Sequence, residues 1–136
     1  MKAFVLDCSV TMSWCFKDER DDYSAYCLRL LEEAEATVPS LWVLEVMNVL
    51  LVAERRARLL PSESEEFIGL LRLLPIAIEP SPGISSRVMD LGRAYRLSAY
   101  DAAYVELALC KGLPMATKDE TVRGVLALLG IEIVLP

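Results

Sequence analysis

Four acidic residues are placed where they could act together: Asp7, Glu45, Asp101 and Asp119. Glu45 is the most informative, because it lies inside the apolar segment 41–52, where a carboxylate is costly unless it is paired or binds a metal ion. Clustered carboxylates repel one another unless a cation joins them. Their hard oxygen atoms favour Mg²⁺ or Mn²⁺, and such ions activate water and neutralise charge on a phosphodiester. We therefore predict a divalent metal site.

Each of these acids also has a plainer interpretation. Asp101 follows Ser98 by three residues, which is a capping-box spacing, and an acid in a first helical turn favours any helix. Asp119 lies within a similar pattern, Thr117-x-x-Glu120. Glu45 could pair with a distant Arg or Lys. Asn48, one turn further along the same helix face, could hold the Glu45 carboxylate or face the site.

The composition limits which mechanisms are available. The chain has no histidine, which excludes Ser-His-Asp triads, Cys-His pairs and imidazole acid–base chemistry. Its net charge is -6, so it has no general electrostatic attraction for nucleic acid. If the substrate is a polyanion, metal ions and local basic groups must offset this repulsion.

Short apolar runs alternate with amphipathic segments along the whole chain. We expect strands at 3–6, 76–79, 113–116 and 131–135, each continuously apolar. Helices are expected at about 23–34, 41–58, 61–74, 84–96, 99–111 and 119–129, with Ser40 as an N-cap and a break at 37–39. This alternation predicts an α/β fold, in which a parallel sheet is covered by helices on both faces. Asp7 and Asp119 would then lie at the same edge, beyond the carboxyl ends of two strands.

The bulk properties predict a single domain over residues 1–136 in a reducing compartment. The length suits one core, and 54% hydrophobic with 25% charged residues is a globular composition. The four cysteines form no Cys-x-x-Cys pair, so they are expected to be reduced thiols. No run approaches the roughly 20 apolar residues of a membrane helix, and the N-terminus does not fit a signal peptide. We expect a cytoplasmic protein with no membrane partner.

Four motifs in order resemble the PIN-domain family, and more closely its VapC-type toxins. They are Val5-Leu6-Asp7-x-Ser9; Val38-Pro39-Ser40-Leu41-Trp42-x-x-Glu45-x-x-Asn48; Ala99-Tyr100-Asp101-Ala102-x-Tyr104; and Leu113-Pro114-x-Ala116-Thr117-x-Asp119. The resemblance covers almost the whole chain. The departures are Cys8, where a small residue such as Ala is commoner, and Lys118, where an apolar residue is common.

The resemblance implies a PIN-like α/β/α sandwich with a mostly parallel five-stranded sheet. It implies an endoribonuclease that depends on Mg²⁺ or Mn²⁺, with Asp7, Glu45, Asp101 and Asp119 as the four acidic positions. Ser9 and Thr117 match hydroxyl positions that line such a site. The implied partners are an RNA substrate, a cognate antitoxin protein and a second copy of the chain in a homodimer.

Other assignments stay open at this stage. Arg55 and Arg56 could steer phosphate, or simply complement the carboxyl end of a helix. Tyr104 could stack on a base, although core packing fits its sequence context better. A receiver-like signalling domain also has a parallel sheet and an acidic Mg²⁺ pocket, but Asp7 is a single acid where a receiver has a pair. A PIN-like binding module without activity is a third reading.

Overall fold

The computed structural model describes all 136 residues. Its centre is a parallel sheet made of β1 (Ala3–Leu6), β2 (Glu35–Pro39), β3 (Ile76–Glu79) and β4 (Met115–Ala116), in the order β3-β2-β1-β4. The residues of β1 explain its central place, because Phe4, Val5 and Leu6 are fully buried. A strand this apolar is stable only when both faces of the sheet are covered.

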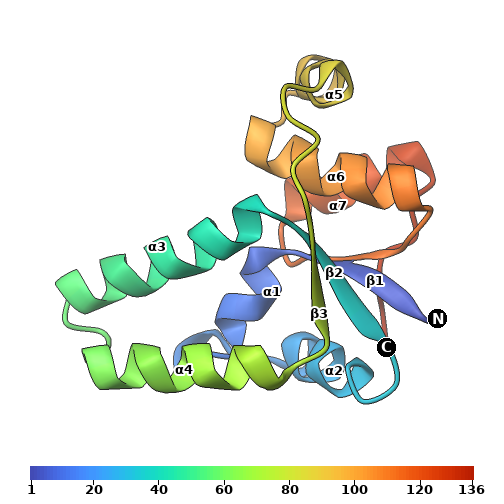
Figure 1. Ribbon diagram of the computed structural model, residues 1–136. Coiled ribbons are helices and arrows are strands. Elements are labelled where there is room, and N and C mark those ends of the chain that lie inside the picture. Colours follow the sequence, from blue (N-terminus) through green and yellow to red (C-terminus); the bar gives the residue numbers. More distant parts are fainter.

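Helices cover both faces, which confirms the predicted α/β fold. Figure 1 shows α5 (Ser86–Tyr95) and α6 (Ala99–Lys111) on one side of the sheet. The other side carries α1 (Cys8–Ser13), α2 (Asp22–Leu30) and α4 (Pro61–Leu73). A short 3₁₀ turn, η1 (Lys17–Glu19), joins α1 to α2, and α7 (Glu120–Leu129) follows β4.

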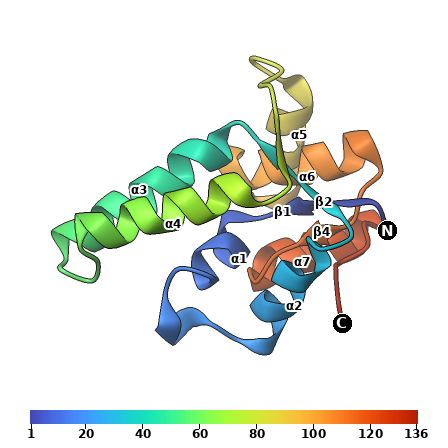
Figure 2. The ribbon, with the colours of Figure 1, turned by 60° about the horizontal axis from the view of Figure 1, so that its bottom comes forward.

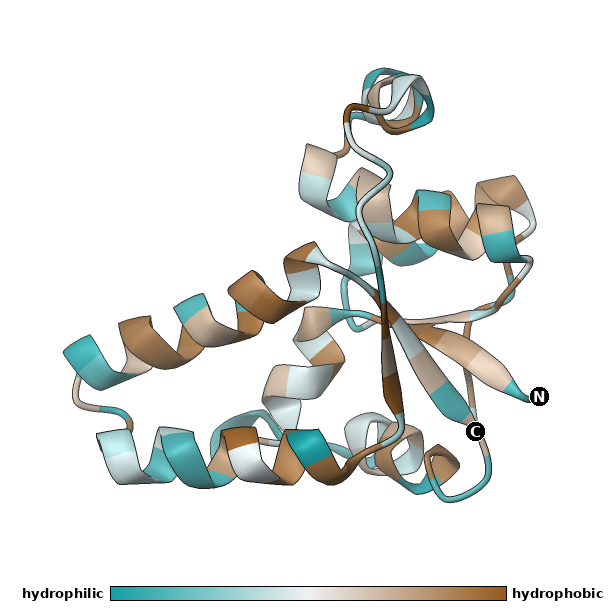
Figure 3. Ribbon diagram, in the orientation of Figure 1, coloured by the Kyte–Doolittle hydropathy of each residue, from teal (hydrophilic) through white to brown (hydrophobic).

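The remaining helix, α3 (Leu41–Arg55), forms an arm with α4 that extends away from the sheet, as Figures 1 and 2 both show. Figure 3 shows that α3 is apolar over much of its length and hydrophilic at its far tip. Ser40 does not cap this helix through its side chain as predicted, because its own backbone is already helical. None of the helices combines the length and apolarity that crossing a bilayer requires.

The strand β2 was missed by the sequence prediction. A helix was expected to run to residue 34, whereas α2 ends at Leu30 and the chain turns directly into the strand Glu35–Pro39. This strand is hard to recognise from its sequence, because its first residue, Glu35, is exposed and only the next three residues, Ala36, Thr37 and Val38, are buried. The strand pairs with β1 from Ala3–Glu35 onward and with β3 on its other side.

The five-stranded sheet implied by the family resemblance is wrong in number. The predicted strand 131–135 is reduced to one bridge, between Met115 and Ile133, with the Val134 N–H donating to the Met115 carbonyl at 2.9 Å. The predicted strand 113–116 shortens to Met115–Ala116, because Pro114 has no N–H to donate to a ladder. Val134 is nevertheless buried, so the last segment still packs on the core.

Candidate active site

Asp7 lies at the carboxyl end of the central strand β1 and is only 8% exposed. Its backbone N–H donates to the Ala116 carbonyl at 3.0 Å, which continues the β1–β4 pairing to the end of both strands. The hydroxyls of Ser9 and Thr117 both donate to Asp7 Oδ2, at 2.7 and 2.8 Å. Burial raises the pKa of Asp7, and repulsion from Asp119 adds to the rise, although the two hydroxyls partly offset it.

The turn at residues 117–119 brings a second acid to the same place. Thr117 Oγ1 donates to Asp7 and also accepts the Asp119 N–H at 3.1 Å, so one buried hydroxyl joins the two acidic residues. Asp119 is the N-cap of α7, where its Oδ1 accepts the Val122 N–H at 2.9 Å. The capping box predicted for Thr117 and Glu120 is therefore wrong. The exposed Asp119 carboxylate caps the helix instead.

Glu45 is held by a tyrosine from a different helix. The Tyr104 hydroxyl donates to Glu45 Oε1 at 2.6 Å, which ties α6 to the first turns of α3. Burial raises the pKa of Glu45, the Tyr104 hydrogen bond opposes this rise, and the charges of Asp7 and Asp101 add to it. Glu45 is half-buried, so the Arg or Lys partner considered from the sequence is not needed and does not occur.

Asp101 stands in the first turn of α6. Ser98 caps this helix as predicted, because its hydroxyl accepts the Asp101 N–H at 3.1 Å. A side-chain hydrogen bond with Ser98 lowers the pKa of the Asp101 carboxyl, but it is outweighed by the effects that raise it. Burial raises the pKa of Asp101, and the charges of Asp7 and Asp119 raise it further. Asp101 therefore lies in the capped first turn of α6 and still interacts with the other acids.

The four carboxylates form one electrostatic group, and none of them is paired with a basic side chain. The charge of Asp119 contributes to the raised pKa of Asp7. The charges of Asp7 and Asp101 contribute to the raised pKa of Glu45, and those of Asp7 and Asp119 to the raised pKa of Asp101. None of the ion pairs in the structure includes any of these acids. Buried or half-buried carboxylates that repel one another and lack a basic partner are an unfavourable arrangement, which a divalent cation would relieve.

The donor set fits a hard divalent ion, although its side chains are not gathered around one point. No three carboxylate or thiol groups lie close enough together to hold one ion between them as they stand. Asp7 and Glu45 are held by hydroxyl groups, and Asp119 Oδ1 is held by the Val122 N–H. Carboxylate oxygens without imidazole or thiolate are the ligands that Mg²⁺ and Mn²⁺ prefer.

The family model of the PIN domain matches residues 4–125, which is most of the chain. The chain belongs to the PIN-domain family. This match spans all four acids and confirms the family indicated by the ordered motifs. It also leaves the receiver-like assignment without support. A search of curated proteins gave no significant match.

Solved structures with the same fold have low sequence identity to this PIN domain. PAE2754 from Pyrobaculum aerophilum is 20% identical, with a TM-score of 0.67 over 93% of this chain and 85% of that one. A toxin–antitoxin complex from Klebsiella pneumoniae is 15% identical, with a TM-score of 0.61 over 85% and 86%. VapBC2 from Rickettsia felis, bound to a promoter DNA fragment, is 10% identical, with a TM-score of 0.65 over 97% of both chains.

Three residues singled out from the sequence make no hydrogen bond or ion pair with the acids of this PIN domain. Asn48 is exposed and makes no side-chain hydrogen bond. Arg55 and Arg56 are exposed at the carboxyl end of α3. Arg55 follows Glu45 by ten residues, which places it about 15 Å further along the helix axis. Neither arginine therefore contacts the carboxylates, and a role for them would concern a more distant part of a substrate.

Two residues that the sequence did not assign to the site take part in its hydrogen bonding. Tyr104 is 1% exposed, as expected for a core residue, but its hydroxyl also orients Glu45. Lys118 was noted only as a departure from the family pattern, and its backbone N–H donates to Ser9 Oγ at 3.2 Å. The spacing of Tyr104, three residues after Asp101, was a usable signal, since both lie on one side of α6.

Proposed function

We propose that this PIN domain is a metal-dependent endoribonuclease and the toxin of a toxin–antitoxin pair. The observation that carries the proposal is the group of four mutually repelling carboxylates with no basic partner. PIN domains are generally nucleases, and two of the similar structures come from toxin–antitoxin systems. We further propose that its substrate is RNA and that it acts in the cytoplasm.

Asp7, Glu45, Asp101 and Asp119 would hold Mg²⁺ or Mn²⁺. When bound, such an ion neutralises charge on a phosphodiester and makes water a better nucleophile. Ser9 and Thr117 fix one oxygen of Asp7, and Tyr104 fixes one oxygen of Glu45, so two of the four carboxylates are oriented before any ligand arrives. Because the chain has no histidine, we propose that one of these carboxylates accepts the proton from the attacking water.

Binding of RNA must overcome the charge of the protein. The net charge of -6 and the acid group both repel a polyanion, so affinity must come from bound metal and from specific contacts. Arg55 and Arg56 are proposed as such contacts. Because they lie at the tip of the α3–α4 arm, they would meet the RNA away from the bond that is cut.

The α3–α4 arm also presents the surface that the proposed protein partners would cover. Leu44, Met47 and Leu51 recur along one side of α3 and are exposed. A groove of about 300 Å³ lies between α3, α4 and β3, and its lining is almost wholly apolar. Apolar surface concentrated in this way is typical of protein–protein interfaces. The antitoxin and a second copy of the chain are the partners we propose, and the mass of the purified protein with and without its genomic neighbour would test both.

The nuclease activity is tested by cleavage of a labelled RNA by three proteins: wild type, Asp7→Asn and Glu66→Gln. Glu66 is an exposed acid on α4, so its variant makes the same chemical change outside the site. We expect wild type and Glu66→Gln to cleave in Mn²⁺ and to stop when a chelator is added. Asp7→Asn should be inactive in both conditions.

Equal cleavage by all three proteins, with and without chelator, would refute the metal mechanism. If no protein cleaves any RNA but wild type binds Mn²⁺, the domain is instead a binding module without activity. The cleavage assay and a measurement of Mn²⁺ binding together decide between the two interpretations of the PIN domain.

A further inference from the structure

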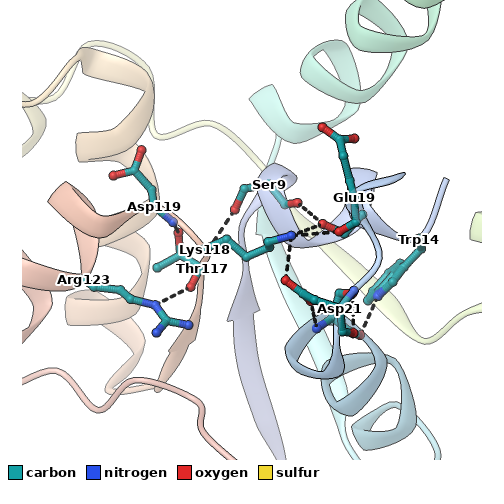
Figure 4. Close-up of polar contacts among 10 residues, drawn as sticks. Ser9, Trp14, Glu19, Asp21, Thr117, Lys118, Asp119 and Arg123 are labelled. Atoms are coloured by element: carbon teal, nitrogen blue, oxygen red, sulfur yellow. Dashed lines mark hydrogen bonds and ion pairs between the residues drawn. The ribbon is translucent and has the colours of Figure 1, made fainter. Parts of the chain in front are cut away.

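Lys118 lies between two residues of the candidate site, but its side chain points away from the acids. Thr117 and Asp119 flank it in the turn before α7. Figure 4 shows its ammonium group reaching from this turn to the opposite side, where Glu19 and Asp21 lie. The lysine therefore adds no direct charge contact to the carboxylate group, and its function must come from what it connects.

The ammonium group of Lys118 is satisfied by three separate elements. Its Nζ donates to Ser13 Oγ in α1 at 2.8 Å, to the Glu19 carbonyl in η1 at 3.0 Å and to Asp21 Oδ2 at 2.9 Å. Asp21 is the N-cap of α2. Exposed ion pairs hold a structure only weakly, but this side chain is 27% exposed and all three of its N–H donors have acceptors. Lys118 thus fastens the turn to the α1–α2 connection.

The backbone of Lys118 reaches Asp7 through a hydroxyl. The Lys118 N–H donates to Ser9 Oγ, and the same hydroxyl donates to Asp7 Oδ2 at 2.7 Å. Thr117 makes the parallel connection, since it donates to Asp7 and accepts the Asp119 N–H. The place of the turn relative to Asp7 therefore rests on two hydroxyls and on the anchored lysine side chain.

Other contacts keep α7 folded without Lys118. The side chains of Val122 and Leu126 in α7 are at most 1% exposed. Arg123 Nε donates to the Thr117 carbonyl at 2.8 Å, and its guanidinium lies 4.6 Å from the centre of the Tyr23 ring in α2. Losing the Lys118 ammonium should accordingly loosen the turn at residues 117–119 while the helix stays packed.

We infer that Lys118 is a positioning residue, which holds Thr117 and Asp119 in place relative to Asp7 and thereby sets the affinity of the site for a divalent cation. That the site binds a metal ion rests on the proposed function, whereas the positioning role rests on the hydrogen bonds of Lys118. Groups that orient metal ligands without touching the metal typically change affinity or activity by about 10–100-fold when removed.

The test compares Lys118→Met with Lys111→Met. Both substitutions keep the aliphatic stem and remove an ammonium from an ion pair, of 2.9 Å to Asp21 and 2.8 Å to Glu79 respectively. Lys111 lies at the opposite end of α6 from Asp101. Two quantities are measured: Mn²⁺ affinity, from the spin-resonance signal of the free ion, and amide hydrogen exchange of residues 117–119 in metal-free protein.

Lys118→Met should bind Mn²⁺ about 10-fold more weakly or worse. The amides of Lys118 and Asp119 should exchange faster, with the melting temperature nearly unchanged. Lys111→Met should match wild type in both measurements. Asp21→Asn provides a second variant that keeps the cap of α2, since Asn caps as well as Asp. Asp21→Asn alone should reduce the Mn²⁺ affinity less than Lys118→Met does, and it should cause no further reduction when combined with Lys118→Met.

Wild-type Mn²⁺ affinity and wild-type exchange in Lys118→Met would overturn the inference, as would additive effects of the two substitutions. Failure of the wild-type protein to bind Mn²⁺ would refute the proposed function instead. In that case hydrogen exchange still decides whether Lys118 positions the turn.

Discussion

Replacing Asp7 by Asn should abolish activity and yet make the metal-free protein more stable. Burial raises the pKa of Asp7 above its ordinary value of 3.8, with a smaller contribution from Asp119. The folded protein therefore binds a proton more tightly than the unfolded chain does. Stability falls as the pH rises from 3.8 through the folded pKa, and above that pKa the full cost of the buried charge is present. At neutral pH the neutral amide removes this cost.

The size of the gain follows from the opposing contributions. The two hydroxyl hydrogen bonds from Ser9 and Thr117 would weaken by about 1 kcal/mol each on losing a charged acceptor. Burial outweighs them, because the pKa is raised on balance. We expect a net stabilisation on the order of 1 kcal/mol, which raises the melting temperature by roughly 4 °C for a domain of this size.

Thermal unfolding at pH 7 with and without Mn²⁺ measures both effects. At one hundred times its dissociation constant, Mn²⁺ should stabilise wild type by about 2.7 kcal/mol, or roughly 10 °C. Asp7→Asn should start from the higher melting temperature and lose this shift, whereas the control Glu66→Gln should behave as wild type. A metal-free Asp7→Asn protein that melts several degrees below wild type would refute the reasoning, because the buried charge would then be stabilising.

Two further substitutions test other parts of the site. Tyr104→Phe removes the hydrogen bond that opposes the raised pKa of Glu45, so the acidic limb of the pH–rate profile for RNA cleavage should move to higher pH. Mn²⁺ binding should be about 10-fold weaker. An acidic limb that does not move would contradict this reasoning. Arg55→Ala combined with Arg56→Ala should reduce the slope of log affinity against log salt concentration by about 1.4 for single-stranded RNA. An unchanged slope would remove both arginines from the proposed RNA-binding surface.

The fold was predictable from the sequence wherever the signal was local. The continuous apolar residues of β1 identified a buried strand, and helix α6 was predicted with the bounds that the structure shows. The strand β2 was missed, because it starts with the exposed Glu35 and follows the end of an amphipathic helix after only four residues. Its partners, β1 and β3, are far away in the sequence, so nothing local distinguishes it from a helix end.

The candidate site was predictable in its acids and, through the family resemblance, in the Ser9 and Thr117 hydroxyls that orient Asp7, but not in Tyr104 or Lys118. Asp7 could be placed by its position after a strand, and Glu45 by its apolar surroundings. The hydrogen bond from Tyr104 to Glu45 joins residues 59 positions apart, and the bond from Lys118 Nζ to Ser13 spans 105. No periodicity or spacing rule reports a contact of that range. The contacts of the Tyr104 hydroxyl and the Lys118 ammonium group could therefore be found only in the structure.

The hydrogen bond between Thr117 and Asp7 spans 110 residues. A ribosome adding about 5–20 residues per second needs roughly 5–20 s to make the segment between them. Throughout that time the growing chain carries Asp7 without the turn that completes its surroundings. Whatever this site does, it cannot begin before residues 117–119 have been made and have folded against Asp7.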